Sequence, residues 1–462
     1  MRYWPIVLPL LAFLVSFAFT YPGVLANADE AKYVRQAAAF AHGRAQVEQV
    51  DPYTGEVSLV RPSDFPPGTS LMLAPLVAVD VRLVSWLPAL ALVLAVLFTA
   101  LALRAAHLQP WYALLVPGFV PALVMARVAT SDVISTMFVA LGWWLFWRGA
   151  SETVPGRRRS VHWLAAGLVA GLSLLLRETN ALLFAPLLVG AAARRDRGWW
   201  WLAVGVAVGV GARLLVAWLV FGDALFIKEA GYGFSAFALL ANAPMYLATL
   251  LVLAPGGLVF GLAYRGLRRP EVVMTVVLVV LFYGAYEYTG QTSGWLKQLV
   301  LGPRFFTPLL PVLAFAMGES APRLLRRLKG RQYLLPAAAG ATTLLAVAVN
   351  VGFGHWTAQQ AEIMQAIEAH VPQGAPVLTN AAATEKFVSE LQGYPIRGEC
   401  RPGVPPPPGA WVVVLQRTDS PNWVAESKKM EPYMAGLHAE VVVDQQFTGT
   451  DHLTILRVAG AE

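Results

Sequence analysis

The chain has 462 residues, of which 57% are hydrophobic and only 14% are charged. Soluble domains carry roughly 25% charged residues, so this composition excludes an ordinary soluble protein and indicates an integral membrane protein. The net charge of +7 does not indicate nucleic-acid binding, because the basic residues collect in alternate loops between apolar stretches.

Apolar stretches recur along the chain, most of them close to the roughly 20 residues that a membrane-spanning helix needs. The stretches predict a polytopic α-helical membrane protein with about eleven spans, at residues 5–25, 83–103, 111–127, 133–148, 161–176, 181–193, 199–221, 246–264, 272–288, 305–318 and 333–353. The stretch at 181–193 is short enough for a re-entrant or buried segment. The first stretch has the parts of a signal peptide, but its length favours an uncleaved helix.

The basic residues are distributed unevenly between the loops that connect these spans. Every second loop carries clusters, such as Arg157 to Arg159 and Arg194 to Arg197. The short loops on the other side hold isolated cations: Arg127, Arg177, Lys228, Lys297 and Arg304. Cytoplasmic loops are enriched in Lys and Arg. We therefore expect a multi-pass protein of the cell (inner) membrane, with its long first loop and its C-terminal tail on the outer side.

The sequence predicts two domains. Residues 1–353 form a transmembrane domain that includes the first outer loop, 26–82, and residues 354–462 form an extracytoplasmic C-terminal domain with seven basic and twelve acidic residues. Segments rich in β-branched residues predict strands, and the segments between them predict helices. The strands fall at 375–380, 410–417, 440–446 and 453–458, and the helices at 381–392 and 422–436. This pattern predicts a small α/β unit, long enough for a core of its own.

An acidic pair, Asp29-Glu30, follows the first apolar stretch. In the structural interpretation, Asn27 caps a helix and Glu30 is its partner three residues further on. Such a cap would still leave Asp29 free to point at a substrate, so the structural and functional interpretations can hold together. Carboxylates at the outer rim of a membrane protein indicate chemistry at the bilayer surface. We therefore predict that Asp29 is a base and that Glu30 assists it.

Asp132 lies in a very short outward turn at the start of the fourth predicted span. Ser131 and Asp132 could simply cap that helix. However, an acidic side chain within a few residues of the hydrocarbon is costly and tends to mark a functional site. Asp132 is therefore a second catalytic candidate, and both interpretations stay open.

Four cations of the outer loops are candidates for binding a phosphate: Arg304, Arg177, Lys228 and Lys297. Arginine binds phosphate through two parallel N–H groups and stays charged. The structural alternative is snorkelling to lipid headgroups. A further arginine, Arg213, lies inside a predicted span and needs an acidic partner, for which Glu287 and Asp223 are the candidates.

No metal or nucleotide site is predicted. A single cysteine, Cys400, excludes an intramolecular disulfide and a thiolate cluster, and the seven histidines form no paired metal-binding motif. A Walker-type loop and a Gly-rich dinucleotide loop are both absent from the sequence. We therefore expect no cofactor.

The order of these parts resembles the GT-C glycosyltransferases, specifically the protein O-mannosyltransferase and aminoarabinose transferase group. The resemblance covers roughly residues 5–318 and rests on Asp29-Glu30 opening a helix with Tyr33 in it, a Phe-Pro-Pro-Gly return at 65–68, Ser131-Asp132, Arg177 before 180–186, and Pro303-Arg304-Phe305. It implies a sugar donor linked to a polyprenyl phosphate, a metal-independent reaction and an outward-facing site. It also implies that Asp29 is the general base, that Asp132 helps to shape the acceptor or donor site, and that Arg304 contacts the donor phosphate.

The same reaction fits the residues on chemical grounds. A polyprenyl-phosphate sugar is already activated, so the enzyme has to hold the phosphate leaving group with cations and deprotonate an acceptor hydroxyl. One carboxylate near the anomeric carbon can do this in a single inverting displacement. The sequence thus predicts a membrane glycosyltransferase. It leaves open the sugar, the polyprenol, the oligomeric state and whether the acceptor is a lipid, a glycan or a protein.

The main competing prediction is a membrane transporter or a flippase for lipid-linked sugars, which would share the spans and the outward acids. Transporters often contain paired repeats with interrupted helices at matching positions, and we find no such symmetry. Transport also does not explain a long first loop together with an outer C-terminal domain. A noncatalytic membrane scaffold is the third interpretation.

Overall fold

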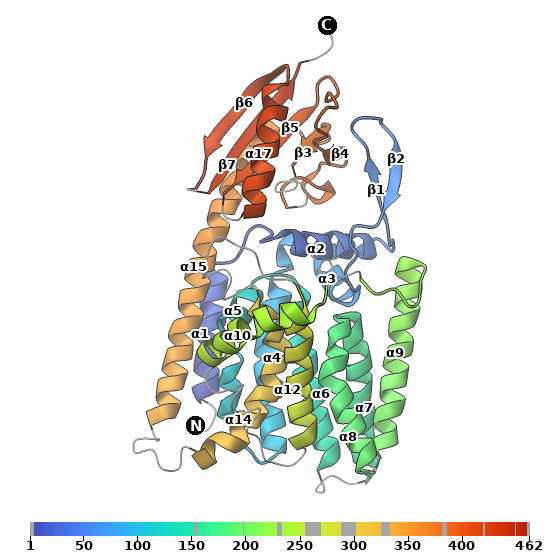
Figure 1. Ribbon diagram of the computed structural model, residues 1–462, viewed down its shortest axis with the longest axis vertical. Helices are drawn as coiled ribbons and strands as arrows, with labels where there is room; N and C mark the ends of the chain where they lie inside the picture. The colour runs from blue at the N-terminus through green and yellow to red at the C-terminus, as the bar shows by residue number, and fades with distance from the viewer. Residues whose placement is uncertain are drawn as a thin grey trace.

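The computed structural model shows a bundle of helices with a sheet-containing domain above it (Figure 1). The structure describes residues 4–151, 156–196, 198–228, 233–254, 269–287, 302–324, 333–380, 386–418, 421–448 and 450–459. Helix α1 (Trp4–Phe19) packs side by side with α15 (Leu334–His370), although they lie at opposite ends of the bundle's sequence. The long helix α15 then carries the chain from the bundle into the upper domain.

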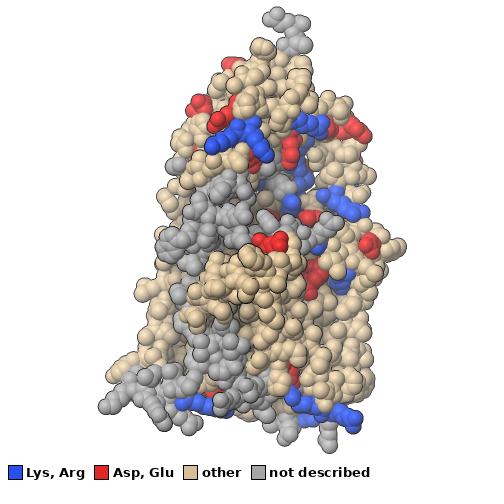
Figure 2. Space-filling view, viewed as in Figure 1, with Lys and Arg blue, Asp and Glu red and all other residues tan. Residues whose placement is uncertain are grey.

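Between α1 and α15 the described helices of the bundle are α4 (Trp86–Ala105), α6 (Ser131–Ala150), α7 (Gly156–Leu172), α8 (Ala181–Ala193), α9 (Trp199–Phe221), α10 (Ala236–Leu253), α12 (Arg269–Ala285) and α14 (Leu310–Leu324). Among the described residues, four stretches are long and apolar enough to cross a membrane: Val81–Ala105, Ser131–Ala150, Trp199–Phe221 and Leu334–His370. Figure 2 shows the described charged side chains mainly at the lower end of the bundle and from its upper end upwards, with a mostly uncharged band between. This distribution is that of a membrane protein.

Three predicted spans differ from the helices observed. Residues 111–127 are interrupted: a 3-10 segment, η2 (Pro110–Leu115), precedes a short helix, α5 (Val120–Met125). Pro117 lies between them, and proline lacks an N–H to donate and disfavours a helical residue before it. Residues 305–318 begin in a 3-10 segment, η5 (Pro303–Leu309), for a similar reason. The span predicted at 246–264 was placed too late, since α10 begins at Ala236. Residues 255–264 lie outside the described residues.

Glycines allow α7 and α9 to approach closely. A Cβ atom added to Gly167 of α7 would lie 2.1 Å from the Leu202 carbonyl oxygen, and one on Gly209 of α9 would lie 2.8 Å from the Cα of Gly171. Gly205 is equally close to the backbone of α7, at 2.2 Å. Small residues four apart let helix backbones pack against each other within a membrane. This contact attaches α9, which is otherwise largely exposed, to the rest of the bundle.

A buried arginine ties α1 and α15 to the turn before α6. Arg127 is fully buried and donates hydrogen bonds to Thr20 Oγ1 at 2.9 Å and to Asn350 Oδ1 at 2.7 Å. Its guanidinium also lies over the rings of Phe17 and Phe353, at 5.2 and 5.1 Å. These contacts give Arg127, one of the isolated outer cations of the sequence, a structural role.

The first loop builds a layer on the upper end of the bundle, as drawn in Figure 1. Its described elements are α2 (Ala28–Ala41), β1 (Val47–Val50), β2 (Val57–Val60), α3 (Gly68–Val79) and η1 (Val81–Leu83). Helix α2 lies across the bundle and packs on α3, whereas β1 and β2 form a hairpin that rises beside the upper domain (Figure 1). The start of α2 was predicted correctly, because the Asn27 side chain accepts a hydrogen bond from the Glu30 N–H at 2.8 Å.

The C-terminal domain is a five-stranded sheet with a helix. Its described elements are β3 (Val377–Thr379), η8 (Glu390–Gln392), β4 (Arg397–Glu399), β5 (Trp411–Arg417), α17 (Pro421–Ala435), β6 (Ala439–Gln446) and β7 (Asp451–Val458). The strand order is β4-β3-β5-β7-β6; β3 is parallel to β4 and β5, and β7 is antiparallel to β5 and β6. All four predicted strands and the helix at 422–436 are present. Strand β4 was missed because its three residues, Arg-Gly-Glu, include no β-branched side chain.

The predicted helix at 381–392 was wrong where it can be compared. Residues 381–385 lie outside the described residues, and 386–392 contain only the short 3-10 turn η8. Phe387 and Val388 are instead buried in the core of the sheet domain. Ser389 caps the turn, and Gly393 ends it at a φ of +88°, a conformation that favours glycine.

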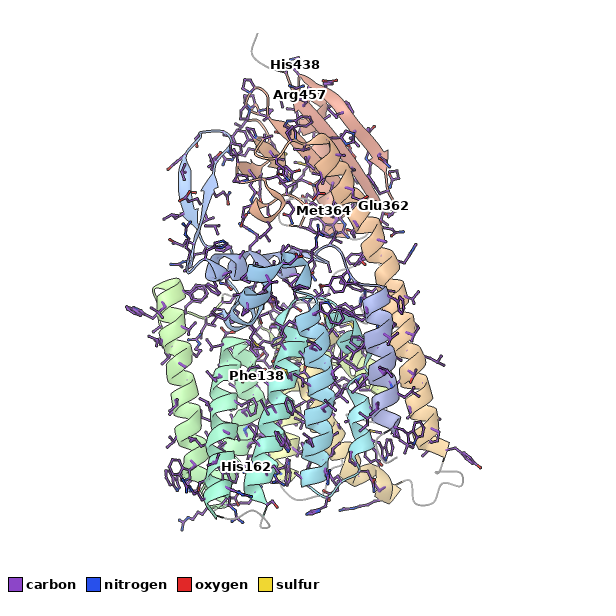
Figure 3. All side chains as sticks on the ribbon, turned by 180° about the vertical axis from the view of Figure 1, so that it is seen from behind. Phe138, His162, Glu362, Met364, His438 and Arg457 are labelled. Carbon is purple, nitrogen blue, oxygen red and sulfur yellow. The ribbon has the colours of Figure 1, made fainter. Side chains whose placement is uncertain are left out.

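Two connections cross the predicted domain boundary at residue 354. Helix α15 continues through it, and Figure 3 labels Glu362 and Met364 on the part of α15 that lies beside the sheet. The β1–β2 hairpin reaches the edge of the same sheet, where Val50 forms a bridge with Ile396. The first loop and the C-terminal domain therefore meet above α2 and form one unit at this end of the bundle.

Candidate active site

Four chain segments bring charged side chains together at the end of the bundle that lies next to the C-terminal domain (Figure 1). They are the first turn of α2, the first turn of α6, the turn at 176–180 before α8, and η5. Each segment is the start of a helix or a break between helices, where polar side chains can cap exposed N–H groups. Five of the seven predicted site residues lie in these segments. Lys228 lies in the loop after α9, and Lys297 lies outside the described residues.

Asp29 and Arg304 face each other across the site. Arg304 Nη2 lies 3.5 Å from Asp29 Oδ2, and the Asp29 side chain is 42% exposed while that of Arg304 is mostly buried. A distance of 3.5 Å is longer than an ordinary charge-assisted hydrogen bond. Asp29 is thus a carboxylate that a substrate can reach, with a guanidinium beside it.

Asp132 and Arg177 form the second pair, which is buried. Arg177 Nη1 is hydrogen-bonded to Asp132 Oδ1, and the Asp132 side chain is only 6% exposed. Its other oxygen, Oδ2, accepts a hydrogen bond from Thr130 Oγ1 at 3.1 Å. A buried ion pair is stable only when both charges are matched in this way. Asp132 therefore holds Arg177 in place and is much less accessible than Asp29.

An aromatic ring brings the two arginines together. The guanidinium carbons of Arg177 and Arg304 lie 5.5 and 5.3 Å from the centre of the Phe305 ring. Phe305 stacks in turn on Tyr283 of α12, with ring centres 5.0 Å apart, and the Tyr283 hydroxyl donates to Thr179 Oγ1 at 2.9 Å. The sequence interpretation missed Tyr283. Its only local signal is a tyrosine within an apolar span, where the hydroxyl needs a partner.

Glu30 belongs to the scaffold of the site. It is 1% exposed, one of its oxygens accepts a hydrogen bond from the Ala129 N–H at 2.7 Å, and the other accepts from the Ala26 N–H. Burial raises the pKa of Glu30 to about 7, although both hydrogen bonds oppose this rise. Instead of pointing with Asp29, as a catalytic helper would, the Glu30 carboxylate joins the start of α2 to the turn that leads to Asp132.

Lys228 lies at the margin of the site. Its Nζ is 3.3 Å from the centre of the Phe65 ring and 3.7 Å from Asp64 Oδ2. Phe65 stacks on Tyr33 of α2 at 4.7 Å, and the Tyr33 hydroxyl is 3.3 Å from Ser131 Oγ. Burial lowers the pKa of Lys228. These contacts connect Lys228 to the two acid–arginine pairs through the rings of Phe65 and Tyr33.

Arg213 has a different partner from those predicted. Its Nη2 lies 3.7 Å from Glu178 Oε1, and its guanidinium donates hydrogen bonds to the carbonyl oxygens of Ala224, at 3.0 Å, and Phe226. Neither Asp223 nor Glu287 pairs with it, because packing places α9 next to the turn at 176–180. Arg213 therefore fixes the loop that leads to Lys228.

The assembled side chains can take up a proton and bind an anion. Asp29 is an accessible proton acceptor, and Arg304 and Arg177 offer N–H groups to phosphate oxygens. Within the described ranges, no group of three or more His, Cys, Asp or Glu side chains is arranged to hold a metal ion.

Comparison with solved structures identifies the fold. The chain superimposes on the crystal structure of ArnT from Cupriavidus metallidurans bound to undecaprenyl phosphate with a TM-score of 0.62 and 15% sequence identity, over 100% of both chains. The apo structure of the same protein gives a TM-score of 0.61 and 16% identity over 99% of both chains. The chain has the fold of the GT-C glycosyltransferases. The GT-C resemblance drawn from the sequence is thereby confirmed for the fold.

Two further solved structures match less closely than ArnT does. The arabinofuranosyltransferase AftD from Mycobacteria matches with a TM-score of 0.48 and 17% identity, over 100% of this chain and 42% of that one. The Archaeoglobus fulgidus oligosaccharyltransferase matches with a TM-score of 0.44 and 14% identity, over 86% of this chain and 64% of that one. No protein-family profile and no curated protein sequence matches the chain.

Proposed function

We propose that this GT-C protein is a membrane glycosyltransferase that moves a sugar from a polyprenyl-phosphate donor to a hydroxyl group of an acceptor. The observation that carries the proposal is the accessible Asp29 beside Arg304, at the end of the bundle where Arg177 provides a second guanidinium. The likeness to ArnT bound to undecaprenyl phosphate supports the class of donor. In this proposal the donor is a co-substrate.

In the proposed reaction Asp29 accepts the proton of the acceptor hydroxyl while the hydroxyl oxygen attacks the anomeric carbon. The bond from that carbon to the phosphate oxygen breaks, and its electron pair leaves with the polyprenyl phosphate. Attack opposite the leaving group inverts the anomeric configuration. Arg304 and Arg177 compensate the charge that develops on the phosphate. We assign no metal ion or other cofactor, because the donor is already activated and guanidinium groups meet its phosphate.

The remaining predicted residues take supporting roles in this proposal. Asp132 keeps Arg177 aligned through their buried pair. Arg304 exchanges Asp29 for the donor phosphate, which leaves the carboxylate to the acceptor. Lys228 lies at the edge of the donor site, and Lys297 stays a prediction from the sequence.

We further propose about eleven membrane spans, with the active site and the C-terminal domain on the extracytoplasmic side of the inner membrane. The positive-inside distribution of Lys and Arg supports this orientation. The partners are then a polyprenyl-phosphate-linked sugar, membrane lipids and a lipid, glycan or protein acceptor. Nucleic acid has no part in the reaction.

The test is transfer of radiolabelled sugar from a panel of polyprenyl-phosphate donors in membranes that contain the wild type or Asp29→Asn. We expect Asp29→Asn to lose on the order of 100-fold or more in rate, because the reaction loses its base. Glu56→Gln, in the exposed tip of the β1–β2 hairpin, is the matched control and keeps its activity. Transfer by Asp29→Asn at the wild-type rate would refute the role of the base. No transfer from any donor by folded wild type would favour a transporter or flippase.

A further inference from the structure

Helix α2, which carries the proposed base, is packed between the bundle and the C-terminal domain (Figure 1). Two of its charged side chains are almost completely buried, Glu30 at 1% exposure and Arg35 at 4%. Burial of a charge is costly unless the charge is paired and hydrogen-bonded. The partners of these two side chains therefore determine how firmly, and at what angle, α2 is held.

Arg35 is paired with an acid of the C-terminal domain. Its Nε lies 2.7 Å from Glu390 Oε1, and Arg397 Nη2 lies 3.6 Å from the other oxygen of the same carboxylate. Arg397 also donates a hydrogen bond to the Val388 carbonyl oxygen at 3.1 Å, and its side chain is buried. One carboxylate thus joins α2 to an arginine that is itself fixed at the start of β4.

Lys386 is a second charged residue of the C-terminal domain that is buried. It donates a hydrogen bond to Gln360 of α15 and lies over two aromatic rings. Its positive charge counters the rise in the pKa of Glu30 that burial causes. Direct contact between α2 and the C-terminal domain is made by the ion pair of Arg35 with Glu390.

We propose that the cluster of Arg35, Glu390 and Arg397 positions Asp29 for catalysis, so that the C-terminal domain is a working part of the active site. The inference rests on the proposed function. Arg35 and Glu390 contact no reacting atom and act as positioning residues. Asp29 and Arg35 lie less than two helical turns apart on one short helix, so a tilt or rotation of α2 changes the distance between Asp29 and Arg304 directly.

Steady-state kinetics of the full-length protein test the proposal. A displacement of about 1 Å in a catalytic group can cost on the order of 100-fold in rate. We therefore expect Glu390→Gln and Arg35→Gln to lower kcat by about 10- to 100-fold while the KM for the donor changes little. The double variant should be no worse than the poorer single variant, because both break one cluster. Arg35→Lys keeps the charge but not the planar fork, and should retain intermediate activity even where Arg35→Gln does not fold.

Asp51→Asn is the matched control. It breaks the 2.7 Å pair between Asp51 and Arg401, which joins the first loop to the same domain without touching α2. Its kcat should equal that of the wild type. Equal losses of kcat in Asp51→Asn and Glu390→Gln would overturn the proposal, because any loosened contact between the loop and the domain would then have the same effect.

Hydrogen exchange gives a readout that does not depend on activity. Amides of residues 28–41 should exchange faster in Glu390→Gln than in the wild type or Asp51→Asn, while the bundle is unchanged. Unchanged exchange in α2 would overturn the proposal, and so would faster exchange with an unchanged kcat. If the wild type transfers no sugar, that failure belongs to the proposed function, and the exchange of α2 alone decides whether the cluster holds the helix.

Discussion

Asp29 and Asp132 each face an arginine, but water reaches only one of them well. The Asp29 side chain is 42% exposed and its pair with Arg304 is long, whereas that of Asp132 is 6% exposed and is hydrogen-bonded on both oxygens. A base must be reachable and must give up its own partner when substrate arrives. An acid that is the buried partner of an arginine must instead keep that arginine, which would otherwise be left with an unpaired buried charge. This contrast favours different roles for two acids that look alike in the sequence.

Arg304 is expected to set the affinity for the donor. Arg304→Ala removes charge-assisted hydrogen bonds worth about 1.5–3 kcal/mol, so the KM for the polyprenyl-phosphate donor should rise on the order of 10- to 100-fold. The KM of Arg304→Lys should fall between those of the wild type and Arg304→Ala, because an ammonium group keeps the charge and loses the bidentate contact. Steady-state rates at varied donor concentration measure this, with exposed Arg82→Ala as control. An unchanged KM would remove Arg304 from the phosphate site.

Glu30 is expected to make the stability of the protein depend on pH. Burial raises its pKa from 4.5 to about 7, so between these values the folded state binds a proton that the unfolded state releases. The contribution of this group to the free energy of unfolding is fully present below pH 4.5. It falls by about 3 kcal/mol as the pH rises to about 7. Thermal unfolding in detergent between about pH 5 and pH 8 should show a falling Tm that Glu30→Gln lacks. Parallel curves for the two proteins would contradict this assignment.

Helix ends, rather than helix centres, meet at the site. Helices α2 and α6 both begin there, and η5 forms a 3-10 break before α14. The first turn of a helix leaves N–H groups unpaired and has a partial positive charge, which favours acids and anions at this end. The apolar middles of α6 and α14 pack into the bundle. The elements therefore provide a polar layer at one end of the bundle without placing charges in the middle of the membrane.

The glycine contact between α7 and α9 allows a sharp test of helix packing. Gly205→Leu should force α9 away from α7, because even a Cβ atom there would lie 2.2 Å from the Leu164 carbonyl oxygen. We expect a loss of about 1–3 kcal/mol from overpacking, visible as a lower Tm in detergent. Gly211→Leu on the same helix is the control, since nothing lies within 4 Å of its added Cβ. Equal Tm values for the two variants would show that the contact does not hold α9.

The whole molecule consists of an apolar bundle under a unit that the first loop and the C-terminal domain build together. The contact is made by the bridge between Val50 and Ile396, by the pair of Asp51 with Arg401, and by Arg35 with Glu390. Both parts therefore lie on the same side of the membrane. Asp29 belongs to this unit and faces Arg304 of the bundle, and the basic clusters lie at the opposite end of the bundle.

Cysteine labelling checks the orientation. In a Cys400→Ala background, Glu56→Cys in the hairpin should react with an impermeant maleimide in intact spheroplasts. Arg158→Cys, at the start of α7, should react only after the membrane is opened. This result follows from the positive-inside distribution of the loops. Labelling of Arg158→Cys in sealed spheroplasts would reverse the proposed orientation.

The sequence alone determined the features that depend on neighbouring residues. Apolar stretches marked the helical bundle, β-branched segments marked four strands, and Asn27 marked the start of α2. The order of short motifs indicated the GT-C fold, and Asp29 and Arg304 could be named as candidates because both lie at ends of apolar stretches.

Only the tertiary structure decided which charges meet. Arg35 and Glu390 are 355 positions apart, Arg213 pairs with Glu178 instead of the acids nearest to its own loops, and the carboxylate of Glu30 turns to the backbone. Periodicity and capping act over a few residues, so they can be read along the chain. A buried charge instead takes its partner from whatever the packing of the whole chain brings beside it. The roles of Asp29, Asp132 and Arg304 follow from that packing, and the proposed variants test them.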